Sequence, residues 1–180
     1  EYVDEELVAM GMSDLPHSSP QLKNALVENI AAGCTVMLNR PAVNLLQSVS
    51  PPEHVQMHDW WFYLVVSAFG DVIYDPEPSI LYRQHSGNVV GAGRSAMARF
   101  ARKVRGQLKR PTKLASKQAE AFLEAYESSL PPEQKETVKR FISAAHGHRH
   151  ISYVLSANRA FRQSRIDDLA FRVLLMLGRI

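Results

Sequence analysis

The sequence predicts an α/β part with short strands and helices over residues 1–93, followed by a basic helical bundle over residues 94–180. Short β-prone runs alternate with helical periodicity in the first part, whereas apolar residues recur at helical spacing through the second. Charge divides at the same place. Residues 1–93 hold 3 Lys or Arg against 11 Asp or Glu, a net charge of −8, while residues 94–180 hold 18 against 7, a net charge of +11. This asymmetry indicates two units with different partners.

The composition is that of a globular protein, with 46% hydrophobic and 22% charged residues among 180. No apolar run reaches the roughly 18 to 20 residues that a membrane span needs. A single cysteine excludes an internal disulfide. The chain begins with Glu1 rather than methionine, at what looks like the end of a strand, so we expect a piece of a longer protein.

Four short strands are expected in the first part. Residues 2–3 form the first strand and lead into an acidic turn. The apolar run over residues 34–38 is too short for a helix and is bounded by glycine and proline, which predicts a buried strand. Residues 72–74 and 79–82 are expected to pair across the proline-containing turn 75–78.

Three helices complete the first part. Residues 21–30 carry leucine and valine at helical spacing, and a short helix over residues 42–47 follows a proline suited to its first turn. The strongest helix covers residues 58–69 and ends before Gly70. Asp59 falls in its first turn, where the helix dipole favours a carboxylate.

The second part is predicted to contain only helices. The first spans residues 94–117 and has no acidic residue, and the second repeats the helical period over residues 113–128. Two prolines start a third helix over residues 131–146. Residues 149–163 and 166–177 complete a bundle of four or five helices.

The basic helix over residues 94–117 has two interpretations, which the sequence leaves open. Basic residues around an apolar stripe suit a helix at an anionic membrane surface. The alternative is a solvated face over a bundle core. Nucleic acid is disfavoured as a partner, because Phe100 is the only aromatic residue in the helix and no known readout motif is present.

The cluster His58-Asp59-Trp60-Trp61 is the first candidate site. Asp59 is either a helix-capping acid or a group that accepts hydroxyl protons, and indole faces beside a carboxylate suit sugar rings. Two consecutive tryptophans cannot both face one side of a core. We therefore expect Trp61 in the core and Trp60 at the site.

Three other positions carry side chains that can form chemical sites. His85 follows a predicted strand beside Arg83, where imidazole suits a divalent metal and guanidinium suits phosphate, although a surface histidine is the commoner case. Cys34 lies in an apolar run and is expected to be a buried, inert thiol. The histidine-rich run 146–150 lacks a zinc ligand set and is expected to be an exposed turn between helices.

A series of motifs in residues 1–93 resembles, in the correct order, the C-terminal part of family 2 glycosyltransferases. The nearest branch is the bacterial rhamnosyltransferase-like one that builds cell-surface polysaccharide. The matching residues are Asn29, Gly33-Cys34-Thr35-Val36-Met37-Leu38-Asn39, Met57-His58-Asp59-Trp60-Trp61, Gly70, Ile73-Tyr74, Pro78, Leu81-Tyr82-Arg83-Gln84-His85 and Asn88-Val89-Val90-Gly91.

The resemblance implies a GT-A fold in which one half binds a nucleotide-sugar and the other half binds the acceptor. It also implies a divalent metal, Mg or Mn, held by an Asp-x-Asp motif that this chain lacks. Residues 1–93 are thus expected to be the C-terminal portion of a catalytic domain, inactive alone, and residues 94–180 a basic C-terminal domain. The expected location is cytoplasmic, peripheral on the inner face of the plasma membrane.

The resemblance implies a role for each residue that matches a motif position of the family. Asp59 matches the general base that deprotonates the acceptor hydroxyl. Gly33, Thr35, His58 and Trp60 would border the acceptor.

Arg83 and Asn88 would reach the leaving diphosphate, and His85 falls where related enzymes present a histidine to the metal or diphosphate. The competing class is a non-enzymatic interaction module, in which the acidic half packs on the basic helices and binds a protein partner.

Overall fold

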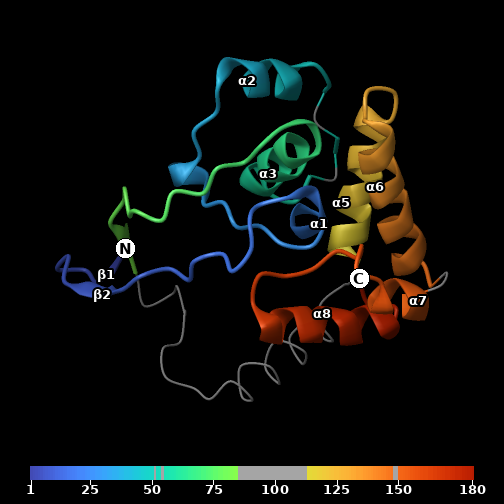
Figure 1. Cartoon of the computed structure of the whole chain (residues 1–180). Coiled ribbons are helices and arrows are strands. Elements are labelled where there is room, and N and C mark those ends of the chain that lie inside the picture. The colour runs from blue at the N-terminus through green and yellow to red at the C-terminus, as the bar shows by residue number, and fades with distance from the viewer. Residues whose placement is uncertain (51, 54, 85–112, 148–149) are drawn as a thin grey trace.

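A computed structural model describes the chain except for residues 51, 54, 85–112 and 148–149 (Figure 1). The described residues form a mixed α/β structure with seven α-helices and one three-stranded sheet. The element order is β1 (Tyr2–Val3), β2 (Ala9–Gly11), α1 (Leu22–Ala25), α2 (Arg40–Gln47), α3 (His58–Phe69), β3 (Tyr82–Arg83), α5 (Leu114–Tyr126), α6 (Pro132–Ala145), α7 (His150–Leu155) and α8 (Arg165–Met176). A 3₁₀ turn, η1 (Gly33–Thr35), precedes α2.

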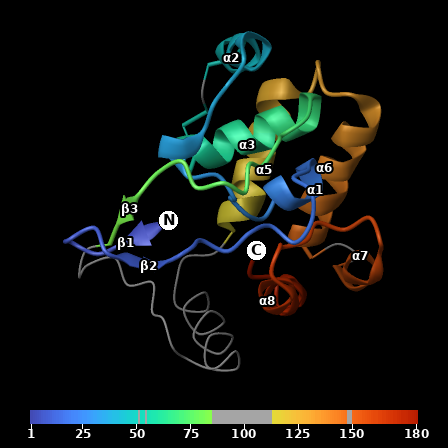
Figure 2. The same ribbon diagram turned by 60° about the vertical axis from the view of Figure 1, so that its left-hand side comes forward.

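The sheet has the strand order β2-β1-β3, and it joins the first residues of the chain to residues 82–83 (Figure 2). β1 pairs antiparallel with β2 and parallel with β3, where Tyr2 lies opposite Tyr82. The N–H of Gln84 donates to the carbonyl oxygen of Val3 at 2.8 Å. The predicted strand at residues 2–3 is therefore confirmed, and β2 is an element that the sequence analysis missed.

Two predicted strands are wrong. The run 34–38 is not a buried strand: Gly33–Thr35 forms η1, and Met37 is 97% exposed. Residues 72–74 have no strand partner, and only Tyr82 of the predicted strand 79–82 pairs. Short apolar runs predict strands only if a neighbouring strand satisfies their backbone, and these runs have none in the described chain.

Most helical predictions within the described residues were confirmed, whereas residues 94–112 of the predicted basic helix 94–117 lie outside them. α3 covers the predicted residues, and α2 begins two residues early because the Asn39 side chain accepts a hydrogen bond from the N–H of Ala42. α5, α6 and α8 match their predicted ranges within two residues at each end. α1 and α7 are much shorter than predicted, ending at Ala25 and Leu155.

One hydrophobic core joins both parts of the chain. Leu22 of α1 and Trp61 and Leu64 of α3 belong to the same buried cluster as Phe122 of α5 and Phe171 of α8. The Trp61 ring lies edge-on to Phe122, with 6.1 Å between centroids. The predicted boundary after residue 93 lies outside the described residues, but the described helices on either side of it share this core.

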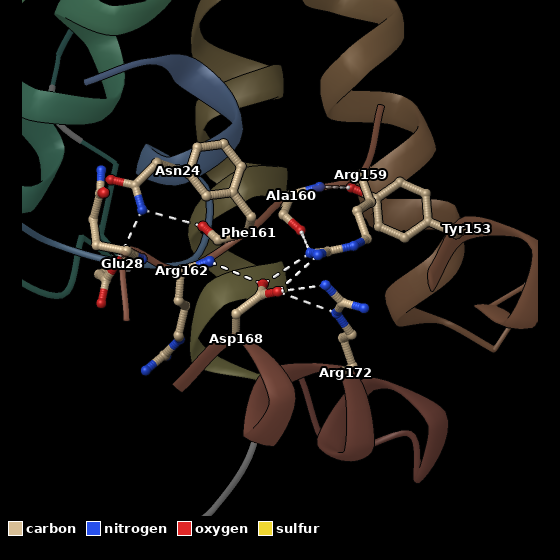
Figure 3. Close-up of polar contacts among 10 residues, drawn as sticks. Asn24, Glu28, Tyr153, Arg159, Ala160, Phe161, Arg162, Asp168 and Arg172 are labelled. Carbon is tan, nitrogen blue, oxygen red and sulfur yellow. Dashed lines mark hydrogen bonds and ion pairs between the residues drawn. The ribbon is translucent and has the colours of Figure 1, made fainter. Parts of the chain in front are cut away.

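The loop between α7 and α8 is held by a polar cluster around Asp168 (Figure 3). The Arg159 guanidinium donates to both carboxylate oxygens, at 2.8 and 2.7 Å, and the backbone N–H of Arg162 donates to Oδ1 at 3.1 Å. Arg172, one helical turn along α8, donates to Oδ2 at 2.8 Å. Burial acts to raise the pKa of Asp168, but the hydrogen bonds from Arg159 and Arg172 outweigh it and hold the pKa below its usual value.

The same loop is tied to α1 near the other end of the core. The Asn24 side-chain amide donates to the carbonyl oxygen of Phe161 at 3.1 Å and to Glu28 at 2.8 Å. Glu28 in turn accepts from the backbone N–H of Gln163 at 2.7 Å. These contacts hold the loop that precedes α8 against α1 and the residues just after it (Figure 3).

Candidate functional site

Asp59 lies in the first turn of α3, and backbone groups hold its half-buried carboxylate in place. Its Oδ2 accepts a hydrogen bond from the N–H of Gly33 at 3.1 Å. Its Oδ1 accepts from the N–H of Trp60 at 2.8 Å. The helix dipole adds a favourable field at this position. The carboxylate is therefore oriented by two backbone N–H groups.

Gly33 packs closely against the His58 side chain. A Cβ at this position would lie 2.6 Å from His58 Nε2 and 3.6 Å from Asp59 Oδ2. Because Gly33 has no side chain, η1 can approach the start of α3 closely. The backbone N–H of Gly33 then reaches the carboxylate of Asp59. The imidazole of His58 also lies edge-on to Phe62, with 5.7 Å between ring centroids.

The structure thus brings three of the predicted site residues together, namely Gly33, His58 and Asp59. Thr35 belongs to the same 3₁₀ turn as Gly33, is exposed, and donates its hydroxyl to the carbonyl oxygen of Ala32 at 2.8 Å. An ionised carboxylate has about four acceptor positions, and in Asp59 the N–H groups of Gly33 and Trp60 occupy two of them. The remaining positions can accept hydrogen bonds from a hydroxyl-bearing ligand.

Trp61 lies in the core as expected, but the expectation that Trp60 lines the site is wrong, because Trp60 is buried as well. Trp60 is 9% exposed and Trp61 is 4% exposed. The indole N–H of Trp60 donates to the carbonyl oxygen of Ala25 at 2.7 Å, which ties α3 to the end of α1. The two indoles leave different sides of α3: Trp60 contacts the end of α1, and Trp61 packs against Phe122 of α5. Trp60 therefore contributes to the site through the packing of α3 on α1, and it does not expose a ring face to a ligand.

The remaining predicted site residues lie apart or cannot be placed. Arg83 is exposed on β3. His85 and Asn88 lie outside the described residues. In the part of the chain that is described, no three His, Cys, Asp or Glu side chains gather closely enough to hold a metal ion.

Cys34 and His146 both lie among the described residues. Cys34 is exposed in η1, so the expectation of a buried thiol is wrong. His146 is exposed at the end of α6, as expected for an inter-helix turn, and its Nε2 lies 2.6 Å from Glu120. Residues 148–149 lie outside the described part.

Sequence analysis missed two polar features. One is the Asp168 cluster, for which the spacing of Asp168 and Arg172 at i and i+4 was an available signal. The other is a groove between α6 and α7, lined by Lys139, Arg140, Ser152 and other residues. Nothing in the sequence links these two helices at that point.

Comparison with family models, curated proteins and solved structures finds no match to this chain. The fold and the site define a mixed α/β protein. At the N-terminus of its buried helix α3, the carboxylate of Asp59 is held by backbone groups beside the imidazole of His58.

Replacing Gly33 with alanine should displace the His58 ring while leaving the fold intact. His58 is exposed, so its imidazole can rotate away from the new Cβ, and we expect less than about 1 kcal/mol of lost stability. The His58 ring resonances in an NMR spectrum report the displacement. Gly70→Ala is the control, because its nearest neighbour would lie 3.9 Å away. Unchanged His58 resonances in the Gly33 variant would contradict the close approach.

Trp60→Phe should destabilise the fold by about 1–2 kcal/mol, because the carbonyl oxygen of Ala25 loses its buried donor. Denaturant unfolding measures this loss. If Trp60 instead presented its ring to solvent, the substitution would leave the free energy of unfolding almost unchanged.

Proposed function

We propose that the chain is the acceptor-binding portion of an inverting family 2 glycosyltransferase. The full-length enzyme transfers a sugar, rhamnose or another hexose, from a nucleotide-sugar to a cell-surface polysaccharide or lipid-linked glycan. The observation that supports this most directly is the hydrogen bond from the Gly33 N–H to Asp59 Oδ2 at 3.1 Å. It joins the two motif segments that the resemblance assigns to the acceptor site, although they lie 26 positions apart.

In this proposal Asp59 is the general base. The acceptor hydroxyl donates a hydrogen bond to a free lone pair of the carboxylate and loses its proton as its oxygen attacks the anomeric carbon of the donor sugar. The nucleoside diphosphate leaves from the opposite face, so the configuration at that carbon inverts. A carboxylate held by two backbone N–H groups keeps its orientation through this step, which lowers the cost of positioning the acceptor.

The other residues of the cluster would position the acceptor. His58 is exposed next to Asp59, and Thr35 is exposed in the 3₁₀ turn that contacts it; both can form hydrogen bonds to further hydroxyl groups of a sugar. Trp60 would act through the packing of α3 on α1. In the family that the chain resembles, an Asp-x-Asp region holds the donor and its divalent metal, and that motif is outside this chain. Arg83 and Asn88 would lie near the diphosphate of the donor.

The proposed location is the cytoplasmic face of the plasma membrane, where nucleotide-sugars and lipid-linked acceptors meet. None of the helices in the described ranges is long and apolar enough to cross a membrane.

A donor screen of the full-length protein tests the proposal. The protein is incubated with individual nucleotide-sugars and lipid-linked or polysaccharide acceptors, and the products are analysed by mass spectrometry and by NMR of the new linkage. We expect transfer from one donor class, with inversion of the anomeric configuration. Retention of configuration would contradict the role of Asp59, and absence of transfer from every donor would favour the interaction-module alternative.

A further inference from the structure

A continuous chain of hydrogen bonds runs from α3 to Asp168 on α8. The O–H of Tyr63 in α3 donates to Asn24 Oδ1 at 2.8 Å, and the Asn24 side-chain N–H donates to the carbonyl oxygen of Phe161 at 3.1 Å. The N–H of the same peptide unit, on Arg162, donates to Asp168 Oδ1 at 3.1 Å. One planar peptide group therefore bridges the side chains of Asn24 and Asp168 (Figure 3).

All the donors in this chain of hydrogen bonds point toward Asp168. The last acceptor is a carboxylate, which polarises the bridging peptide group and makes its carbonyl oxygen a better acceptor. Tyr63 and Asn24 are 3% and 0% exposed, so water competes little for their hydrogen bonds. Burial also raises the pKa of Tyr63 to about 12, which keeps the hydroxyl proton in place. In such surroundings each hydrogen bond strengthens the next, and a change at one end affects the other.

The near end of the chain of hydrogen bonds holds the candidate site. Tyr63 lies one helical turn after Asp59 in α3. Trp60 donates its backbone N–H to Asp59 Oδ1 and its indole N–H to the carbonyl oxygen of Ala25. Asn24 and Ala25 are consecutive in α1, so α1 holds the first two turns of α3. The position of α1 therefore fixes one of the N–H groups that orient Asp59.

The far end holds α1 through the loop before α8, in which residues 161–163 are bonded through their backbone. The carbonyl oxygen of the first residue accepts from Asn24, and the N–H of the second donates to Asp168. The N–H of the third donates to Glu28 Oε2 at 2.7 Å, an oxygen that also accepts from Asn24 at 2.8 Å. A change in the contacts of Asp168 therefore reaches α1 through this loop.

We propose that α8 is a positioning element for the candidate site, and that the contacts of Asp168 are transmitted through Asn24 and Tyr63 to the start of α3. Substitutions at sites without shared partners normally act independently, whereas residues in one hydrogen-bond network are coupled. The second part of the chain thus helps to set the geometry around Asp59. This inference goes beyond the proposed function and holds whatever reaction Asp59 performs.

Tyr63→Phe removes one link of this chain of hydrogen bonds and keeps the ring in the core. The effect is read at the far end, from the Arg162 amide resonance in an NMR spectrum of the isotope-labelled full chain. Asn24 loses one partner and polarises the bridging peptide less. We therefore expect the Arg162 amide proton to shift upfield and to exchange faster with solvent.

The matched control is Tyr126→Phe. Its hydroxyl also donates to a carbonyl oxygen, that of Leu45 at 3.2 Å, and the residue is 1% exposed, but it lies outside this chain of hydrogen bonds. The control should leave the Arg162 amide unchanged. An unchanged Arg162 amide in the Tyr63 variant would overturn the proposal, as would equal shifts in both variants, which indicate general loosening of the core.

Arg172→Gln tests the same coupling from the other end. It removes one of the two guanidinium groups bound to Asp168, so the carboxylate should accept more strongly from the Arg162 N–H. We expect the Arg162 amide proton to shift downfield and the Trp60 amide resonance, beside Asp59, to shift with it.

Arg165→Gln is the control for this second variant. It removes the same charge from an exposed position in the first turn of the same helix, and it should shift neither amide. A Trp60 amide that does not respond to Arg172→Gln, or that responds equally to both variants, would overturn the proposal. No measurement here depends on glycosyl transfer, so such a result leaves the proposed function untouched.

Discussion

Asp59→Asn should abolish most of the turnover of the full-length enzyme while the fold survives. An amide cannot accept the hydroxyl proton, and the loss of a general base lowers rates by roughly 10²- to 10⁴-fold. The side chain keeps one acceptor oxygen, so one of the N–H groups of Gly33 and Trp60 retains its partner. We therefore expect a loss of about 1 kcal/mol in the free energy of unfolding, far less than unfolding requires. The measurement is kcat on saturating donor and acceptor.

The matched control is Asp71→Asn, an exposed carboxylate just beyond the other end of α3. It removes the same charge close to the same helix but should leave turnover unchanged. Acceptor affinity in the Asp59 variant should fall much less than kcat, because the lost step is proton transfer. Turnover within a factor of a few of the unaltered enzyme would remove Asp59 from the mechanism.

The sequence predicted the helices well where the helical period and the end signals agreed. α3 combines an apolar stripe with Asp59 in its first turn, and α6 combines two prolines with an acid in the first turn. The predicted helix 149–163 ended early, at Leu155. Its continuation makes tertiary contacts instead, with the Arg159 side chain bound to Asp168. Such contacts override local helical preference and leave no local signal.

The strands and the burial of Trp60 were harder to predict than the helices, for a physical reason. The run 34–38 has strand propensity, but a strand needs a neighbouring strand to satisfy its backbone hydrogen bonds. The N–H of Gly33, just before this run, instead donates to the Asp59 side chain. Trp60 was expected at the surface because two adjacent tryptophans point to different sides of α3. That geometry holds, yet α1 and α5 bury both sides, and only the packing of distant helices reveals this.

The core of the candidate site was predictable because its residues lie in two motifs. Asp59 and Gly33 were identified from their order in the sequence, and the structure brings them within hydrogen-bonding distance. His85 and Asn88 remain predictions outside the described residues. The role of each group in transfer remains a proposal that the Asp59 variant tests.

Asp168→Asn should cause the largest loss of stability that we expect from one substitution. Asp168 is 8% exposed and accepts hydrogen bonds from the side chains of Arg159 and Arg172 and from the backbone of Arg162. An amide leaves two guanidinium groups without their counter-charge, one of them mostly buried, with only 13% of the Arg159 side chain exposed. Removing one partner of such a pair costs about 3 kcal/mol. Urea unfolding followed by circular dichroism measures the change.

Glu127→Gln is the control for this substitution. Glu127 also contacts two cations, Lys135 and Lys139, but all three side chains are substantially exposed. Solvent screens that cluster, so the midpoint of unfolding should hardly move. If the two variants lost the same stability, burial would not be what makes the Asp168 cluster important.

The pH dependence separates the charge of Asp168 from its shape. Its pKa in the folded protein is held below the ordinary value of 3.8 by the arginine hydrogen bonds, which outweigh the opposing effect of burial. A depressed pKa contributes stability that is fully present above the unfolded pKa and is lost as the pH falls through the folded one. The difference in unfolding free energy between the unaltered chain and Asp168→Asn should therefore be constant near neutrality and shrink below about pH 4. A difference that stayed constant into acid would show that Asp168 acts through packing rather than through its charge.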